Sequence, residues 1–121
     1  MGLTISLLVF AYLAFIINKE IKDKCELAKS KYSGDCVTAL SFFLEDENNS
    51  FGDRNSAIWA IGQIGDKKAL PTLQKYYTGN IPNKEPWNKV VSQYELKKAI
   101  SSLNGNNPNI FRFLIINWGN N

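Results

Sequence analysis

Two cysteines are the side chains of this sequence with the clearest capacity for covalent chemistry. Cys25 and Cys36 are the only cysteines among 121 residues, and the sequence contains no histidine. The lack of histidine excludes Ser-His-Asp and Cys-His catalysis and every zinc site that uses a histidine ligand. The pair can form a disulfide, can serve as two small buried hydrophobes, or can supply a nucleophile at Cys36 near a helix N-terminus.

The disulfide depends on how the chain turns between the two cysteines. A turn at Ser33-Gly34 in an antiparallel hairpin would offset Cys25 from Cys36 by roughly 9 Å, whereas a disulfide allows about 7 Å between Cα atoms. A bridge would then require the first helix to end early, near Ala28. As a nucleophile Cys36 lacks a histidine partner. We therefore expect a protein that is not an enzyme, with no cofactor and no bound metal.

The first part of the sequence is chemically unlike the rest. Residues 2–17 carry no charge, whereas all 14 basic and 11 acidic side chains lie between Lys19 and Arg112. Sixteen residues make about 24 Å of helix, close to a hydrocarbon core of roughly 30 Å, and Asn18 and the stem of Lys19 can extend the span. We predict that residues 1–18 are a transmembrane anchor in contact with lipid. The alternative is a cleaved leader, although no small-x-small motif follows the run.

Two features predict opposite sides of the membrane for the remaining chain. A series of lysines follows the apolar run, and the positive-inside rule then places the domain in the cytoplasm. These lysines are Lys19, Lys22, Lys24, Lys29 and Lys31. A cysteine pair instead favours an oxidising compartment. The residues Asn48-Asn49-Ser50 form a glycosylation sequon. The side stays open, with the lysines favouring the cytoplasm.

A short sequence motif recurs at a regular spacing within residues 19–105. Ala39-Leu40, Ala69-Leu70 and Ala99-Ile100 are each thirty residues apart. A period of this length indicates stacked helical hairpins, because each hairpin needs its neighbours to bury its apolar face. We predict an all-α domain of about two to three such units.

The expected helices follow from apolar spacing, caps and breakers. They cover residues 19–31, 36–45, 54–64 and 67–77, followed by a long helix that Pro86 opens and that runs through Leu103. Asp35 and Asp53 are the expected N-caps of the second and third helices. Pro71 predicts a short or kinked start to the fourth helix.

The run RNSAIWAIGQIGDKKALPTL, from Arg54 to Leu73, resembles a HEAT repeat. It is most similar to the short HEAT-like units of phycobilisome lyases, which carry Arg, then Ala-x-x-Ala-Leu-Gly-x-Leu-Gly-Asp, then Ala-x-Pro-x-Leu. The resemblance implies a binding scaffold and does not imply lyase activity. It also implies that Arg54, Gly65, Asp66 and Pro71 stabilise the repeat, with the arginine and aspartate side chains forming ladders between units.

Four aromatic side chains are the candidates for a partner surface, because aromatic residues are enriched at interface hot spots. They are Tyr76, Tyr77, Trp87 and Tyr94. The partner would be another protein, because a net charge of +3 gives no indication of nucleic-acid binding. Residues 106–121 are predicted to be an apolar C-terminal tail or cap.

These observations predict a non-enzymatic scaffold or adaptor that binds another protein and is held at a membrane by its N-terminal helix. Two alternatives remain. One is a secreted or extracytoplasmic domain with a cleaved leader and a Cys25–Cys36 disulfide. The other is a lyase-like or thiol-dependent enzyme that uses Cys36.

Overall fold

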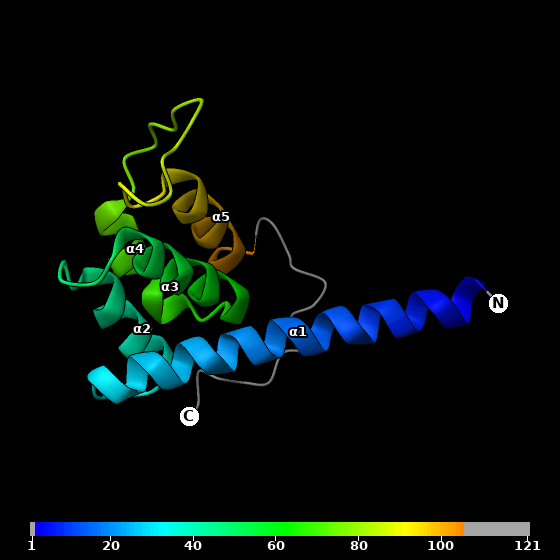
Figure 1. The fold of residues 1–121 in the computed structure, drawn as a ribbon. Coiled ribbons are helices and arrows are strands. Elements are labelled where there is room, and N and C mark those ends of the chain that lie inside the picture. Colours follow the sequence, from blue (N-terminus) through cyan, green and yellow to red (C-terminus); the bar gives the residue numbers. More distant parts are fainter. Residues whose placement is uncertain (1, 106–121) are drawn as a thin grey trace.

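The computed structural model describes residues 2–105, and within this range the chain forms only helices and loops. The helices are α1 (Gly2–Lys31), α2 (Cys36–Glu45), α3 (Phe51–Ile64), the short 3-10 helix η1 (Lys67–Ala69), α4 (Leu70–Tyr76) and α5 (Gln93–Leu103) (Figure 1). The all-α prediction is confirmed. The predicted C-terminal tail, residues 106–121, lies outside the described residues.

Helix α1 has two halves in different surroundings. Its N-terminal half projects away from the other helices (Figure 1), and large apolar side chains such as Leu3, Leu7 and Phe15 are exposed there. The second half belongs to the core, since Ile21 and Ala28 are fully buried. Among the helices of residues 2–105, α1 alone is long and apolar enough to cross a membrane, which suits an anchor or a signal sequence. The domain boundary predicted at residue 18 stays a prediction, because α1 passes through it without a break.

Helix α3 is the centre of the domain. It packs against α1, α2 and α5, and its buried apolar residues are Ala57, Ile58, Ala60 and Ile61. The approach of α5 is close because position 62 has no side chain. A Cβ atom at Gly62 would lie 3.1 Å from both Cα and Cβ of Ala99. The Ser102 hydroxyl donates to the Gly62 carbonyl oxygen at 2.8 Å, which ties the two helices together at this point.

Side-chain caps define where several helices begin. Asp35 caps α2 as expected, accepting from the Thr38 N–H at 2.9 Å. The predicted Asp53 cap of α3 is wrong. Ser50 is the N-cap and accepts from the Asp53 N–H at 3.2 Å, so α3 starts at Phe51 rather than Arg54. Ser and Asp are both good caps, and the helix takes the earlier one although Gly52 in its first turn has a low helix propensity.

The turn after α3 has the geometry that its sequence predicts. Gly65 adopts the left-handed conformation (φ 76°), which an L side chain would disfavour. Asp66 then caps η1 by accepting from the Lys68 N–H at 3.0 Å. Pro71 lies in the first turn of α4, where its missing N–H costs nothing, and the α-helix therefore starts only at Leu70. The segment expected at residues 67–77 is thus split into η1 and α4.

The long helix predicted from Pro86 is wrong. Residues 77–92 are a loop, and α5 begins only at Gln93, after the N-cap Ser92. The cause is a set of hydrogen bonds to a buried side chain of α3, described below, which hold residues 87–92 in a non-helical path.

The close contact between α3 and α5 gives a direct test. We expect Gly62→Val to destabilise the domain by about 1–3 kcal/mol, because its Cβ would already lie 3.1 Å from Cα of Ala99 and its two methyl groups need further space. Chemical unfolding of the full chain in detergent, followed by circular dichroism, measures the loss. Gly52→Ala is the matched control, since its Cβ would meet no atom closer than 3.4 Å and should change stability by less than about 0.5 kcal/mol. Equal losses for the two variants would contradict this account of the packing.

Candidate partner-binding surface and the disulfide junction

A buried asparagine organises the loop of residues 77–92. Asn55 lies on α3 and is fully buried. Its Nδ2 donates to the carbonyl oxygens of Trp87 (2.9 Å) and Val90 (3.0 Å), and its Oδ1 accepts from the Ser92 N–H (2.7 Å). A buried amide usually finds such partners, because each unsatisfied group costs free energy. The second half of the loop is therefore fixed to α3 through its backbone.

Two further side chains fix the loop to α5. Glu85 accepts from the Ser92 hydroxyl (2.6 Å) and from the Gln93 N–H (2.5 Å), which places its charge at the N-terminus of α5. Gln93 in turn accepts from the Thr78 N–H (2.8 Å) and donates to the Tyr76 carbonyl oxygen (3.0 Å). Both ends of the loop are thus held by specific bonds. Loops of this length without helices or strands are uncommon unless they have a function.

The fixed loop exposes apolar side chains. Trp87 is 42% exposed, and its Nε1 lies 3.5 Å from where a Cβ of Gly52 would be, so the indole lies over the start of α3. Phe51 and Val90 are also exposed in this part of the domain. We call Phe51, Trp87 and Val90 the loop surface.

The four predicted partner-surface residues have different surroundings. Trp87 belongs to the loop surface. Tyr94 is 53% exposed on α5, with the Lys98 ammonium 4.5 Å from the ring centre. Tyr76 and Tyr77 are half-buried and pack against the core, so they support the loop more than they present a surface. A role of these residues in binding stays a prediction.

Sequence reasoning missed the residues that shape this loop. Asn55, Glu85 and Gln93 bond to groups between 7 and 37 residues away. Apolar periodicity gives no signal for such bonds. The one available signal was a polar residue, Asn55, at a position of α3 that faces the core.

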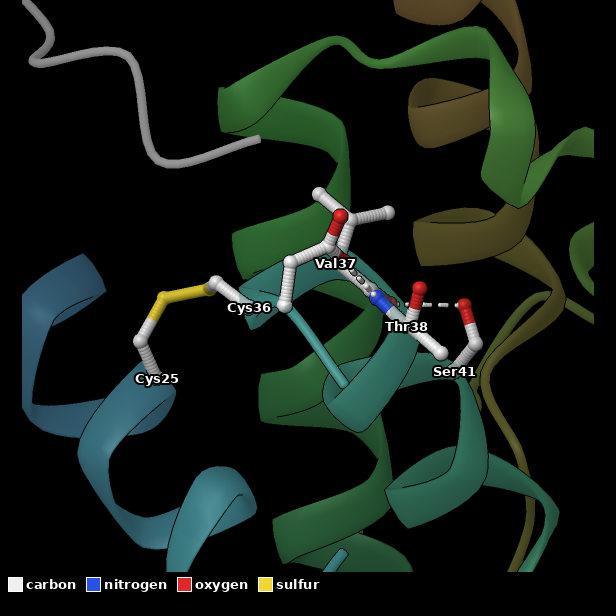
Figure 2. The surroundings of a disulfide bond; sticks show 6 residues. Cys25, Cys36, Val37, Thr38 and Ser41 are labelled. Atoms are coloured by element: carbon white, nitrogen blue, oxygen red, sulfur yellow. Dashed lines mark hydrogen bonds between the residues drawn. A yellow bond between two sulfur atoms is a disulfide. The ribbon is translucent and has the colours of Figure 1, made fainter. Parts of the chain in front are cut away.

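Cys25 and Cys36 are joined by a disulfide between α1 and α2 (Figure 2). Their Cα atoms are 5.1 Å apart, and the residues are 2% and 1% exposed. The bond closes a short loop in the chain, which in the chain-entropy model stabilises the fold by about 3 kcal/mol.

The antiparallel hairpin expected from a turn at Ser33-Gly34 is wrong, so the offset expected between Cys25 and Cys36 does not arise. Helix α1 does not end near Ala28 but continues to Lys31. Cys36 at the start of α2 lies beside Cys25, whereas the end of α2 lies beside the end of α1, where the Tyr32 hydroxyl donates to Asp46 Oδ2 at 2.5 Å. The two helices therefore run in the same general direction. The intervening loop carries the chain back along α1 by about 9 Å, which its four residues can span.

A carboxylate that accepts side-chain hydrogen bonds lies at each end of α2. The hydrogen bond from Tyr32 lowers the pKa of Asp46, while burial and the same bond raise the pKa of Tyr32. At the other end Asp35 pairs with Lys68 of η1. Burial alone would raise the pKa of Asp35, but the hydrogen bonds from Lys68 and Thr38 outweigh it and lower that pKa below its usual value. The bond to Asp35 also raises the pKa of Lys68.

Among residues 2–105, Arg54 bonds to a backbone carbonyl and not to an aspartate, unlike in the ladder that the family resemblance implied. It is buried, and its Nε donates to the Leu44 carbonyl oxygen at 2.7 Å, near the end of α2. Its guanidinium lies over the rings of Phe51 and Tyr76, with 5.5 Å and 5.8 Å between the guanidinium carbon and the ring centres. Asp66 instead pairs with Lys68 at 3.6 Å. Arg54 thus links the repeat to α2 by bonding to a backbone carbonyl oxygen near the end of that helix, and not to a carboxylate.

The buried asparagine can be tested by truncation. We expect Asn55→Ala to cost about 2–3 kcal/mol, since it leaves the buried Ser92 amide without its acceptor. Hydrogen exchange of the Ser92 amide should accelerate in the same variant. The control is Asn88→Ala, an exposed position in the same loop, which should change stability by less than about 0.5 kcal/mol. Unchanged exchange at Ser92 in the Asn55 variant would show that another group orders the loop.

The Asp35–Lys68 pair makes stability depend on pH. Because the folded-state pKa of Asp35 is lowered, its contribution is present above about pH 4 and is lost as the pH falls through the folded-state pKa. We expect the full chain to be more stable than Asp35→Asn at neutral pH and equal to it in strong acid. Asp35→Ala also loses the cap acceptor, so it should be less stable than Asp35→Asn by about 1 kcal/mol at neutral pH. Urea unfolding across the acid range measures these differences, and a constant gap between the full chain and Asp35→Asn would refute the assignment.

Comparison with known proteins gives one match. Residues 53–78 match the family model of the PBS lyase HEAT-like repeat. No curated protein and no solved structure matches the chain. The matched range begins in the first turn of α3 and ends just after α4, so it covers one helical unit with its Gly65-Asp66 turn. Domains built from such repeats often bind proteins. The unit formed by α3, η1 and α4 is therefore a PBS lyase HEAT-like repeat, set within an all-α chain that starts with a long apolar helix.

Proposed function

We propose that this chain is a protein-binding module, held at a membrane by α1, that binds its partner through the loop surface. The observation that carries the proposal is the ordered loop of residues 77–92. Its backbone is fixed by Asn55, while Trp87 and Val90 stay exposed. A surface that is ordered before binding loses less entropy on association, and aromatic anchors dominate many interfaces.

The placement of the loop suits this role. Figure 1 shows the loop, in yellow-green, projecting from the domain on the side away from α1. A partner bound there would not compete with the helix for space. The membrane would also raise the local concentration of the module, so a modest affinity would suffice.

Helix α1 supports the membrane attachment. The exposed apolar half would be unfavourable in water, and the same helix continues into the core through Ile21 and Cys25. Anchor and domain would then be one rigid element with no linker between them.

A non-enzymatic role is part of the proposal. The sequence has no histidine, and the sulfur atoms of Cys25 and Cys36 are bonded to each other inside the protein. A disulfide sulfur is not a thiolate, so the thiol-dependent alternative lacks its nucleophile in this state.

Site-specific photo-crosslinking tests the proposal. A photoreactive phenylalanine analogue replaces Asn88 in the full chain, expressed in the native host, and membranes are washed with alkali before illumination. We expect the chain to stay in the washed membranes and to form a discrete crosslinked product with another protein. Trp87→Ala together with Val90→Ala should reduce that product at least fivefold, because the apolar anchors are lost.

Lys67 provides the matched control position. It is exposed on η1, which follows the C-terminal end of α3, whereas Phe51 of the loop surface lies at the N-terminal end of α3. The same analogue at Lys67 should give no comparable product. Equal crosslinking from both positions, or a product that the double variant leaves unchanged, would refute the loop surface. Release of the chain by alkali would refute the anchor.

A further inference from the structure

We infer that the helical domain lies on the oxidising side of the membrane, where Cys25 and Cys36 become a disulfide. This goes beyond protein binding and rests on one element of the proposed function, which is that α1 directs the chain to a membrane. It holds whether the apolar run of residues 2–17 stays as an anchor or is removed as a leader, because both cysteines lie C-terminal to that run.

The geometry of the pair favours a bonded state. The separation of 5.1 Å between Cα atoms lies within the range that disulfides adopt. This spacing arises from the fold, since α2 starts beside Cys25 only because the chain runs back along α1. The two cysteines come from different helices, and in the described part of the chain neither sulfur is free.

Burial restricts where the bond can form. The two cysteines are 2% and 1% exposed in the folded domain, so a macromolecular oxidant cannot reach their sulfur atoms after folding. The bond must therefore form while the chain is still folding, by exchange with the disulfide of an oxidising dithiol protein. The two thiols lose two protons and two electrons, one S–S bond forms in this chain, and the oxidant's S–S bond is reduced to two thiols. Compartments outside the cytosol supply such oxidants, whereas the cytosol keeps thiols reduced.

The lysines that follow α1's apolar run predict the opposite orientation. That rule applies to short loops of up to about 60 residues, because longer segments cross the membrane largely regardless of charge. Residues 19–121 form a segment well above that length. The orientation signal of the lysines is correspondingly weak here, and the disulfide decides between the two predictions.

Trapping of the thiol state tests the bond. The full chain is expressed in its host, quenched in acid, denatured and treated with a maleimide-linked polyethylene glycol, with or without prior reduction. We expect no mass shift without reduction and a shift by two adducts after it. Cys25→Ser is the matched control and should show one adduct without reduction. Two adducts on the unreduced full chain would overturn the inference.

The sequon Asn48-Asn49-Ser50 offers a built-in test of the side. Asn48 is exposed in the turn after α2, and no other Asn-x-Ser/Thr sequence occurs in the chain. On translation in the presence of microsomes, we expect a glycosidase-sensitive mass shift that Asn48→Gln abolishes. A second chain, Asn48→Gln extended at its N-terminus by an acceptor sequon, should stay unmodified.

The reverse pattern, with only the N-terminal acceptor modified, would overturn the inference and leave membrane attachment intact. Modification of neither acceptor would mean that the chain does not enter the membrane, which would refute the anchor as well. The mass of the translated product distinguishes a retained helix from a cleaved leader. Modification of Asn48 in either case supports the placement of the helical domain on the oxidising side.

Discussion

The close packing of other helices against α3 is the constraint on which the rest of the domain depends. Three other helices pack on this one helix, and they approach closely because many of its contact positions hold alanine or glycine. At Gly62 an added Cβ would lie only 3.1 Å from Ala99, so a larger residue would push α5 away from α3. The positions of α1, α2 and α5 are therefore all defined relative to α3. A HEAT-like unit normally buries its faces against neighbouring repeats, and here α1, α2 and α5 take the place of those neighbours.

Helix α3 also determines the conformation of the loop of residues 77–92, and with it the loop surface. Asn55 places a polar group inside the core, and a polar group there is stable only when its hydrogen bonds are made. The backbone of the loop supplies the hydrogen-bond partners of Asn55. Disorder in the loop would therefore leave a buried polar group unsatisfied and destabilise the core. Arg54, the residue before it, similarly satisfies a carbonyl group near the end of α2. Neighbouring polar residues on α3 thus form two separate contacts, one with the end of α2 and one with the loop.

Local patterns predicted the parts of the fold that depend on local bonds. The turn at Gly65-Asp66, the cap at Asp35 and the interrupted start at Pro71 all follow from the conformations that these residue types prefer. The HEAT-like unit was recognisable for the same reason, because its pattern is short and continuous. Residues 86–92 were predicted as helix because Pro86 is a good first residue and few breakers follow. Bonds to Asn55, more than thirty residues away, outweigh that preference. The direction of α2 was likewise missed, because contacts such as that of Tyr32 with Asp46 determine it and the turn sequence does not.

The continuity of α1 has a mechanical consequence. No glycine or proline interrupts the helix after Gly2, so it contains none of the residues that commonly kink a helix, and its 30 residues form a rod of about 45 Å. When such a rod crosses a bilayer, a tilt of its membrane half tilts the whole domain by the same angle. Rotation about the rod axis carries the loop around a circle at a nearly constant height above the lipid. The loop would then meet partners at one level above the membrane, and changes in bilayer thickness that tilt the rod would raise or lower that level.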